Sequence, residues 1–431
     1  MRHFVGTSTP SATIPEWKAE PKTHSNDIHS DQTSSRRMKI ALVTSFPPSR
    51  GDLNEYGYHL ACALRDDPGV ELVILADETS SVEEAPGFNV QRCWRFNSAF
   101  NVLRLLRAVR KTNPDVVWFN IGFSTFARDP LAAFLGITVP ALVRRLGYYS
   151  HVTLHTVFER INLEDAGVRW PGLYRAAGRV ATRLLLSADD VSVLLPSFRS
   201  ELINKYGVDE RRVHSRPHGI FQSAKPAASA HSSQPTVLAF GYWGTYKRLE
   251  LLLESMEEIG NKVPEAVLAI AGMNHPSTPG YLESLQERYR GNRRIRFLGY
   301  VPEEELPALF RSASVLVLPY TSAAGTSGVV HQACEYGLPM VAADIPEMRE
   351  LAREEGIAID FYAQGDGDAL TNHLVALLGS IEMRRRASEH NSSVAQGMQM
   401  SSVVNEYLHL FEVRLKKPGE LEKCPQSAFP R

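Results

Sequence analysis

Short apolar segments alternate with longer amphipathic segments along almost the whole chain, and this alternation restricts the fold more than any other feature of the sequence. In the first half, apolar runs typical of buried strands occur at 39–44, 71–76, 115–120, 152–156 and 191–195. Helical patterns separate them, for example at 55–65, 102–111 and 174–186. Strands separated by helices predict a parallel sheet that is covered on both faces.

The same alternation restarts after residue 235. The second set of predicted strands covers 236–240, 266–271, 295–298, 315–318 and 340–343. Its predicted helices cover 248–258, 281–290, 303–312, 327–336 and 346–354, and residues 367–413 are predicted to form terminal helices. The sequence therefore predicts an α/β protein with two Rossmann-like domains, whose parallel sheets face an interdomain cleft.

The domain boundaries follow from composition. Residues 1–37 are polar and without periodicity, as in a disordered tail, and 222–235 (QSAKPAASAHSSQP) is typical of a linker. These segments leave 38–221 as the N-terminal domain and 236–400 as the C-terminal domain. Residues 401–415 are expected to form a helix that packs back on the N-terminal domain, and 416–431 a loose tail.

Charge and cysteine content exclude several classes of protein. The formal net charge of the 431 residues is -1, which does not favour a nucleic-acid partner. The four cysteines form no CxxC pair and suit a reduced, cytoplasmic protein better than a disulfide scaffold or a zinc site. The acidic pairs Asp189–Asp190 and Asp366/Asp368 lack the other ligands of a metal site, so no metal is expected.

Two segments raise the question of membrane contact. The apolar stretch 131–143 contains Pro140 and is too short to span a bilayer, so it is predicted to be a buried core segment. One face of the helix predicted at 102–111 carries Arg104, Arg107, Arg110 and Lys111. Such a stripe suits an anionic membrane surface, although a solvated helix face is the commoner reason for it.

Candidate ligand-binding residues follow the predicted strands, where open α/β sheets bind their ligands. After the first strand come Gly51 and Asp52, in a loop where glycine lets backbone N–H groups approach a phosphate closely. After the first strand of the second half come Gly241, Tyr242 and Lys247. Lys247 is predicted at the start of a helix, where an anionic ligand would explain a cation.

Two further candidates lie after later strands. Gly325, Thr326, Ser327 and Gly328 lead into a helix that carries Gln332, and free N–H groups at that point form a phosphate cradle. Ser327 is also expected to act as an ordinary N-cap. His155 follows the strand VTLHT, where it can either donate to a substrate hydroxyl or be a structural histidine.

Five segments in this order resemble the group 1 glycosyl transferases, a family of retaining nucleotide-sugar transferases with the GT-B fold. The resemblance extends from about residue 38 to residue 415 and is densest in the second half. The stretches that carry it are FPPSRGDLNEYGYHLACAL, RPHGIF, FGYWGTYKRLELLLES, RIRFLGYVPEEELPALFRSASVLVLPY and CEYGLPMVAADIPEMRELAREEG.

The resemblance implies roles for individual residues. Lys247 matches the lysine that holds the donor diphosphate, and Gly51 matches the first glycine of the loop under the donor phosphates. His155 matches a histidine near the sugar and the acceptor, and Thr326–Gly328 match the helix start that faces the diphosphate. Where the family has an arginine, a second loop glycine and paired glutamates, this chain has Tyr242, Asp52, and Ala324 with Gln332, respectively.

The implied activity is retaining transfer of a sugar, most simply a hexose, from a nucleoside diphosphate sugar to a hydroxyl acceptor, in polysaccharide or glycolipid synthesis. The donor is a co-substrate, and no cofactor is expected. Catalysis is assigned to His155 and Lys247. The missing glutamates leave open a non-catalytic sugar-nucleotide-binding protein. Because the fold alone does not determine function, a nucleotide-sugar epimerase or hydrolase on the same fold stays open as well. The resemblance also allows peripheral contact with the inner face of the membrane.

Overall fold

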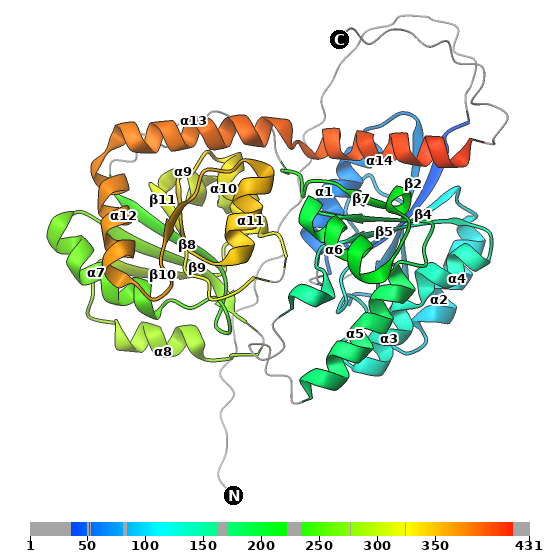
Figure 1. The fold of residues 1–431 in the computed structure, drawn as a ribbon, viewed down its shortest axis with the longest axis horizontal. Coiled ribbons are helices and arrows are strands. Elements are labelled where there is room, and N and C mark those ends of the chain that lie inside the picture. Colours follow the sequence, from blue (N-terminus) through cyan, green and yellow to red (C-terminus); the bar gives the residue numbers. More distant parts are fainter. Residues whose placement is uncertain are drawn as a thin grey trace, which may run out of the picture.

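The computed structural model describes residues 36–49, 51, 53–80, 84–161, 170–221, 234–275, 277–323 and 325–416, which form two lobes side by side (Figure 1). Most of the tail expected at 1–37, nearly all of the linker expected at 222–235 and the tail after Lys416 lie outside the described residues.

The first lobe contains a parallel sheet of seven strands in the order β3-β2-β1-β4-β5-β6-β7. The strands are β1 (Met38–Val43), β2 (Val70–Asp77), β3 (Val90–Trp94), β4 (Val116–Ile121), β5 (Tyr149–Leu154), β6 (Asp190–Val193) and β7 (Val213–Ser215). The helices are α1 (Asn54–Arg65), α2 (Asn101–Thr112), α3 (Pro130–Ile137), α4 (Val139–Arg145), α5 (Pro171–Leu185) and α6 (Pro196–Tyr206), with short 3₁₀ turns η1 (Phe158–Arg160) and η2 (Glu210–Arg212).

The second lobe contains a parallel sheet of six strands in the order β10-β9-β8-β11-β12-β13. Its strands are β8 (Thr236–Trp243), β9 (Val267–Asn274), β10 (Ile295–Gly299), β11 (Val315–Leu318), β12 (Met340–Ala343) and β13 (Asp360–Tyr362). Its helices are α7 (Glu250–Lys262), α8 (Tyr281–Arg288), η4 (Glu303–Glu305), α9 (Leu306–Ser312), α10 (Gly328–Glu335), α11 (Pro346–Glu355), α12 (Gly367–Gly379) and α13 (Ile381–Gly397).

The strand orders place the ligand-binding edge of each sheet. In the first sheet the order reverses between β1 and β4, and in the second between β8 and β11. Loops at the carboxyl ends of these neighbouring strands diverge to opposite faces and leave a crevice, the usual ligand position in doubly wound sheets. The predicted fold class, two Rossmann-like halves with parallel sheets, is confirmed.

Several elements differ from the prediction. The edge strands β3, β7 and β13 were not predicted, and β5 begins at Tyr149, three residues before the expected start. The stretch 131–143 forms α3 and most of α4 rather than one core segment, and Leu131 at its start is 65% exposed. No helix within the described ranges has the length and apolar character needed to cross a bilayer.

The last helix, α14 (Met400–Leu415), returns to the first lobe, as Figure 1 shows along the top of the molecule. Tyr407 and Phe411 on α14 pack with Trp118 of β4 in a core cluster that also includes residues of β1 and α1. Near its end, Arg414 donates to both oxygens of the buried Asp190 at 2.8 and 2.9 Å. His214 and Tyr149 also contact this carboxylate, each at 2.8 Å.

The chain crosses between the lobes again just before α14, and this crossing meets the end of the first lobe. Ile220 N donates to Met398 O at 2.8 Å, and Met400 N donates to Ile220 O at 3.1 Å. Residues 220 and 399 thus form an isolated parallel bridge. The end of the first lobe and the segment that leads into α14 therefore touch each other at this point.

His151, on β5, is a buried imidazole with no hydrogen-bond partner for either ring nitrogen among the described residues. Its ring lies against Trp118, Tyr407 and Phe411. Burial, reinforced by His214 and Arg216 and opposed by Asp190, lowers its pKa to about 3. This histidine therefore stays neutral in the folded protein at any physiological pH.

We expect His151→Leu to make the protein less sensitive to acid. The unfolded chain binds a proton at His151 near pH 6.5, whereas the folded chain binds it only near pH 3. The free energy of unfolding therefore falls as the pH decreases from about 6.5 to about 3. In the leucine variant this fall should be smaller, and stability at pH 7 should be equal or higher by about 1–3 kcal/mol because an unsatisfied polar group is removed. Urea unfolding at several pH values measures both effects. His409→Gln, on the exposed face of α14, is the control that should leave the profile unchanged.

Candidate active site

Lys247 lies in a tight turn that follows β8. Gly244 and Lys247 exchange two backbone hydrogen bonds, at 2.9 and 3.0 Å. The turn between them depends on positive φ angles at Gly244 (104°) and Thr245 (52°). Helix α7 begins only at Glu250, so the predicted placement of Lys247 at a helix start is wrong. The turn delays the helix and leaves Lys247 in an extended bridge to Tyr320, at the end of β11.

The Lys247 side chain is held among uncharged groups. Its Nζ lies 4.6 Å from the centre of the Tyr320 ring. Burial lowers the pKa of this ammonium, but Tyr320 and Tyr246 raise it more, so the pKa lies above its ordinary value and the group stays charged. No carboxylate forms a salt bridge with Lys247 in the described part of the chain. A half-buried cation without a counter-ion is a ready partner for an anion.

The start of α10 lies in the loop after β11, the strand next to β8 in the sheet. Ser327 occupies the N-cap position but its hydroxyl makes no capping bond, so the expected capping role is wrong. Thr326 Oγ1 and Ser327 Oγ are both buried, and neither has a hydrogen-bond partner among the described atoms. Two unused hydroxyls beside the free N–H groups of a helix start suit a phosphate.

His155 lies just beyond β5 and is held in one tautomer by a chain of hydrogen bonds. Thr44 donates to the carbonyl of Ser45 at 3.0 Å, and Asn120 Nδ2 donates to Thr44 Oγ1 at 3.0 Å. Asn120 Oδ1 is therefore the acceptor for His155 Nε2 at 2.6 Å, so Nε2 carries the proton. Burial lowers the pKa of His155 to about 3, so the ring is neutral and its Nδ1 is an acceptor.

The His155 loop contacts the α10 loop of the other lobe. Thr156 and Gly325 form an antiparallel bridge, and a Cβ on Gly325 would come within 2.7 Å of the His155 carbonyl oxygen. Only glycine permits this approach. The sequence-predicted residues His155 and Gly325, which are 170 positions apart, therefore meet where the two lobes face each other.

Two histidines stack beside this contact. The His331 ring, on α10, lies 4.4 Å from the ring of His218, at an angle of 20°. Both His331 nitrogens face acceptors, Ser327 O at 2.9 Å and Glu355 Oε2 at 2.7 Å, which fits an imidazolium. Burial lowers the pKa of His331, but Glu355 raises it more, and the result lies above the ordinary value. Burial and His331 hold the pKa of His218 well below its ordinary value.

The loop after β1 is fixed from beneath by Asp77, at the end of β2. Phe46 N donates to Asp77 Oδ1 at 3.1 Å, and Ser49 Oγ donates to Oδ2. The N–H of Gly51 donates to Ser49 Oγ at 3.1 Å, so this amide has a partner within the loop. A Cβ on Gly51 would lie 2.5 Å from Ser45 Oγ. Glycine is thus required here for close packing within the loop.

The remaining predicted residues are less fully defined. Gly241 lies within β8 with φ 147°, and Tyr242 beside it is 54% exposed. Gln332 is half-buried on α10, one residue after His331. Asp52 and Ala324 lie outside the described residues. In the described ranges no group of three or more His, Cys, Asp or Glu side chains is placed to hold a metal ion.

Sequence reasoning missed four residues of this region: Asn120, His218, Glu355 and Arg128. The first three are buried polar groups at element ends, and their roles arise from contacts across the sheet or the lobes. Arg128, in the loop after β4, acts with Lys247 on His275 of the second lobe: burial is the main cause of the lowered His275 pKa, and both cations add to it. A basic residue in the loop that follows a buried strand, seven residues after its end, was the available signal for Arg128.

Comparison with known families identifies both halves of the chain. Residues 53–221 match the family model described as Glycosyltransferase Family 4, and residues 234–380 match the model described as Glycosyl transferases group 1. Between them the two matches take in both lobes. The chain belongs to the group 1 glycosyl transferases. The predicted family is thereby confirmed.

Curated relatives of this group 1 protein include several mannosyltransferases. It is 27% identical to a phosphatidyl-myo-inositol mannosyltransferase of Mycobacterium leprae over 46% of this chain and 52% of the relative. It is 25% identical to a GDP-mannose-dependent alpha-(1-6)-phosphatidylinositol monomannoside mannosyltransferase of Mycolicibacterium smegmatis, over 70% of this chain and 80% of the relative. The chain thus spans about half the length of the Mycobacterium leprae relative.

Solved structures share the fold. Sucrose-phosphate synthase from Thermosynechococcus elongatus matches with a TM-score of 0.68 and 18% identity, over 88% of this chain and 99% of that one. Anabaena Alr3699/HepE in complex with UDP-glucose matches with a TM-score of 0.67 and 15% identity, over 88% and 100% of the two chains. At this identity the likeness establishes the GT-B fold alone.

Proposed function

We propose that this group 1 protein is a retaining hexosyltransferase that moves a sugar from a nucleoside diphosphate sugar to a hydroxyl acceptor. The observation that carries the proposal is that the loops after the neighbouring strands β8 and β11 hold, respectively, the half-buried Lys247 ammonium without a carboxylate partner and a helix start with two unused buried hydroxyls. A cation without a carboxylate partner and two hydroxyls without hydrogen-bond partners suit a diphosphate. The names of the mannosyltransferase relatives and the UDP-glucose bound to HepE support a nucleoside diphosphate hexose.

Departure of the nucleoside diphosphate builds negative charge on its phosphate oxygens. Lys247 and the α10 start, with Thr326 and Ser327, would stabilise this charge as it forms. The acceptor hydroxyl would approach from the same face as the leaving group and transfer its proton to a departing phosphate oxygen, which gives retention at the anomeric carbon. This route needs no protein nucleophile, and we propose that it needs no metal ion.

His155 would orient a substrate rather than donate a proton. A ring whose pKa is lowered to about 3 is neutral at pH 7 and cannot serve as a general acid there. Its Nε2 proton is committed to Asn120, so Nδ1 would accept a hydrogen bond from a hydroxyl of the sugar or the acceptor. In this proposal His155 positions the sugar through that bond.

Gln332 keeps open a second candidate, a sugar-nucleotide-binding protein without transferase activity. The resemblance places a glutamate at this position, whereas the glutamine here is neutral and binds ribose hydroxyls without charge. The cysteines Cys62, Cys93 and Cys334 are free, which supports the proposal of a reducing, cytoplasmic location.

A donor screen tests the proposal. UDP, GDP, ADP and their hexose conjugates are added at increasing concentration while thermal unfolding is followed. One nucleotide class should raise stability by about 2.7 kcal/mol at a hundred times its dissociation constant. The same donor is then incubated with and without a panel of lipid-linked and free hydroxyl acceptors. Acceptor-dependent release of the nucleoside diphosphate supports the transferase, binding without release supports the second candidate, and no shift with any nucleotide contradicts both.

A further inference from the structure

One face of the first lobe is formed by helices whose charged side chains are all basic. Helices α2, α3, α4 and α5 contact one another in a layer against the first sheet. None of them contains Asp or Glu. Their basic residues are Arg104, Arg107, Arg110 and Lys111 on α2, Arg144 and Arg145 on α4, and Arg175, Arg179 and Arg183 on α5. We call this layer the basic face.

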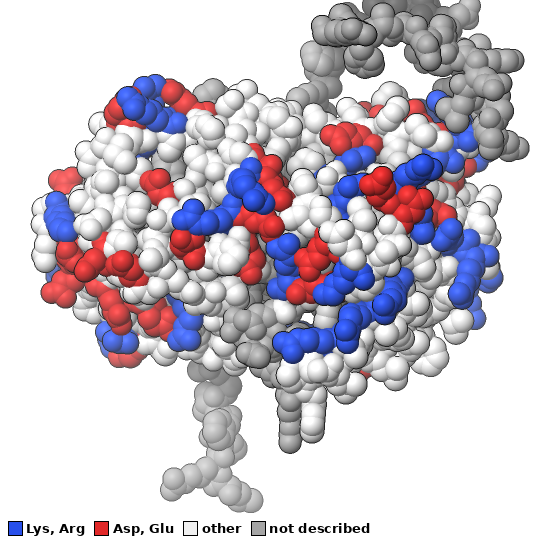
Figure 2. Space-filling model, viewed as in Figure 1, with Lys and Arg blue, Asp and Glu red and all other residues white. Residues whose placement is uncertain are grey.

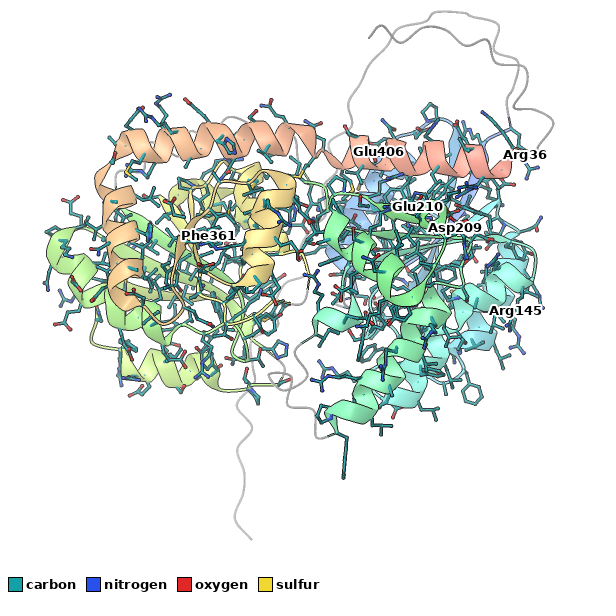
Figure 3. All side chains as sticks on the ribbon, in the orientation of Figure 1. Arg36, Arg145, Asp209, Glu210, Phe361 and Glu406 are labelled. Carbon is teal, nitrogen blue, oxygen red and sulfur yellow. The ribbon has the colours of Figure 1, made fainter. Side chains whose placement is uncertain are left out.

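The basic face is not a by-product of a basic protein. The chain as a whole carries a net charge of -1, so the rest of it is acidic on balance. In Figure 2 a blue band crosses the lower part of the right-hand lobe, where Figure 1 places α5 and α4. Arg145 projects outward from the edge of the same lobe in Figure 3. Positive charge is therefore gathered on one side of one lobe.

Most of these cations are available to an external partner. Arg104 donates to Glu78 at 2.7 Å, Arg144 pairs with Asp189 at 2.9 Å, and Arg183 lies over the Tyr206 ring. The others are exposed, and none of them forms an ion pair with a residue in the described ranges: Arg107, Arg110, Lys111, Arg145, Arg175 and Arg179. The stripe predicted on α2 is thus shorter than expected, because Arg104 turns toward Glu78.

Helix α5 presents two adjoining exposed stripes. Gly178, Ala181, Thr182 and Leu185 form its buried side. At helical spacing, Leu173, Ala176 and Val180 form a row opposite this buried side, and Arg175, Arg179 and Arg183 form the row beside it, on one flank of the helix. Leu173 is 69% exposed and Val180 is 46% exposed. Trp170, just before the helix, is 64% exposed.

Large apolar side chains recur at the exposed ends of the neighbouring helices. Leu131, at the start of α3, is 65% exposed, and Phe100 and Leu103, at the start of α2, are 67% and 53% exposed. Apolar groups in water are unfavourable, and a surface that mixes them with arginines gains from a partner that accepts both. A lipid bilayer with anionic headgroups is such a partner, because headgroups pair with arginines while the adjoining apolar side chains enter the interface.

We propose that the basic face docks the protein on an anionic phospholipid membrane, with α5 lying in the interface. A soluble polyanion would pair with the arginines but leave Trp170, Leu173 and Val180 in water, and for this reason we favour the membrane. Basic residues near an anionic leaflet and buried apolar side chains contribute together to such binding.

This docking would hold the candidate active site near the lipid surface. The buried side of α5 packs on η1, where Gly178 faces the Phe158 ring so closely that a Cβ would lie 2.0 Å from it. η1 follows His155 and Thr156 in the chain and carries Arg160, which pairs with Glu350 of the second lobe. That the acceptor is lipid-linked rests on the proposed function, whereas docking itself does not.

Vesicle sedimentation tests the proposal with the full-length protein. Vesicles are made of phosphatidylcholine alone or with part of it replaced by phosphatidylglycerol. The protein should bind the anionic vesicles, bind phosphatidylcholine weakly, and lose binding as salt increases. The triple variant Arg145→Gln/Arg175→Gln/Arg179→Gln should bind the anionic vesicles on the order of 100-fold more weakly, at about fivefold per charge. Leu173→Ser/Val180→Ser should also bind them more weakly.

Control variants separate this result from damage elsewhere. Arg288→Gln/Arg290→Gln/Arg386→Gln removes three exposed cations from the second lobe and should bind vesicles normally. Each variant should keep the melting temperature and nucleotide-induced shift of the native protein, which reports on the proposed function separately. Absence of binding to anionic vesicles, or equal loss in the control, overturns the proposal. So does binding to heparin that matches vesicle binding and is unaffected by Leu173→Ser/Val180→Ser, which indicates a soluble polyanion instead.

Discussion

Replacing Lys247 by alanine is expected to lower turnover by on the order of 10²-fold or more, the usual cost of removing one group that stabilises developing charge. The ammonium has no carboxylate partner within the described residues, so its removal leaves no buried acid unpaired and the fold should survive. The loss should fall mainly on kcat if Lys247 acts on the departing phosphate, and on KM if it only anchors the donor. Steady-state kinetics with the donor found by the nucleotide screen measure this split.

Two further variants make the Lys247 result specific. Lys247→Met keeps much of the side-chain length without the charge and should resemble the alanine variant. Arg248→Ala removes the next cation along the chain, which is exposed and pairs with Glu250 at 2.9 Å, and it should change turnover little. Unchanged turnover in Lys247→Met would refute the proposed role of the ammonium.

Asp190→Ala should be the most destabilising single substitution among the polar residues discussed above. The buried carboxylate faces Arg414, His214 and Tyr149. Breaking a fully buried pair typically costs about 3–5 kcal/mol, and the cost here should be smaller because the Arg414 side chain is 35% exposed and is solvated once the carboxylate is removed. Burial raises the pKa of Asp190, but hydrogen bonds from His214, Arg414 and Tyr149 lower it by more, so the pKa lies below its ordinary value. The stabilisation is therefore present above about pH 4 and is lost as the pH falls through the lowered pKa.

Glu406→Ala is the matched control for Asp190→Ala. Glu406 is on α14, the helix that also carries Arg414, and it is labelled in Figure 3. It pairs with Arg216 at 3.2 Å, and its side chain is 54% exposed. Exposed pairs contribute about 0–1 kcal/mol. Urea unfolding should give a larger difference between Asp190→Ala and the native protein at pH 7 than at pH 3. Equal effects of the two substitutions would contradict the anchoring role of Asp190.

The fold could be predicted because its central strands are continuous apolar runs. Strands such as β1, β4 and β11 are buried along most of their length, and their pattern is visible without any contact information. The edge strands β7 and β13 have three residues each and are extended because they pair with a neighbouring strand, so no pattern in their own sequence predicts them. In β3 a polar VQRCW sequence hides the strand, because Arg92 is used to bind the loop after β1.

The candidate site was predictable only at the level of loops. Lys247, His155 and the 325–328 loop follow strands and stand out by chemistry, and the structure places the last two in contact. The turn at Gly244 and Thr245, which displaces Lys247 from its helix, depends on positive φ angles that sequence alone did not reveal. Asn120 and His218 could not be predicted, because their roles come from partners distant in the sequence. Asn120 contacts His155, 35 residues away, and His218 contacts His331, 113 residues away.

The bridge between residues 220 and 399 determines how the two lobes can move. Two backbone bonds join the end of the first lobe to the segment before α14, so sliding of one lobe past the other at this spot would break them, whereas a rotation about this spot would not. The 155–156 loop lies close to this spot, because the His155 ring is 6.2 Å from the ring of His218, two residues before Ile220, so this loop would move little in such a rotation. Cleavage of the chain within 222–233 would leave the bonds between Ile220 and residues 398–400 in place, so the two fragments should stay associated.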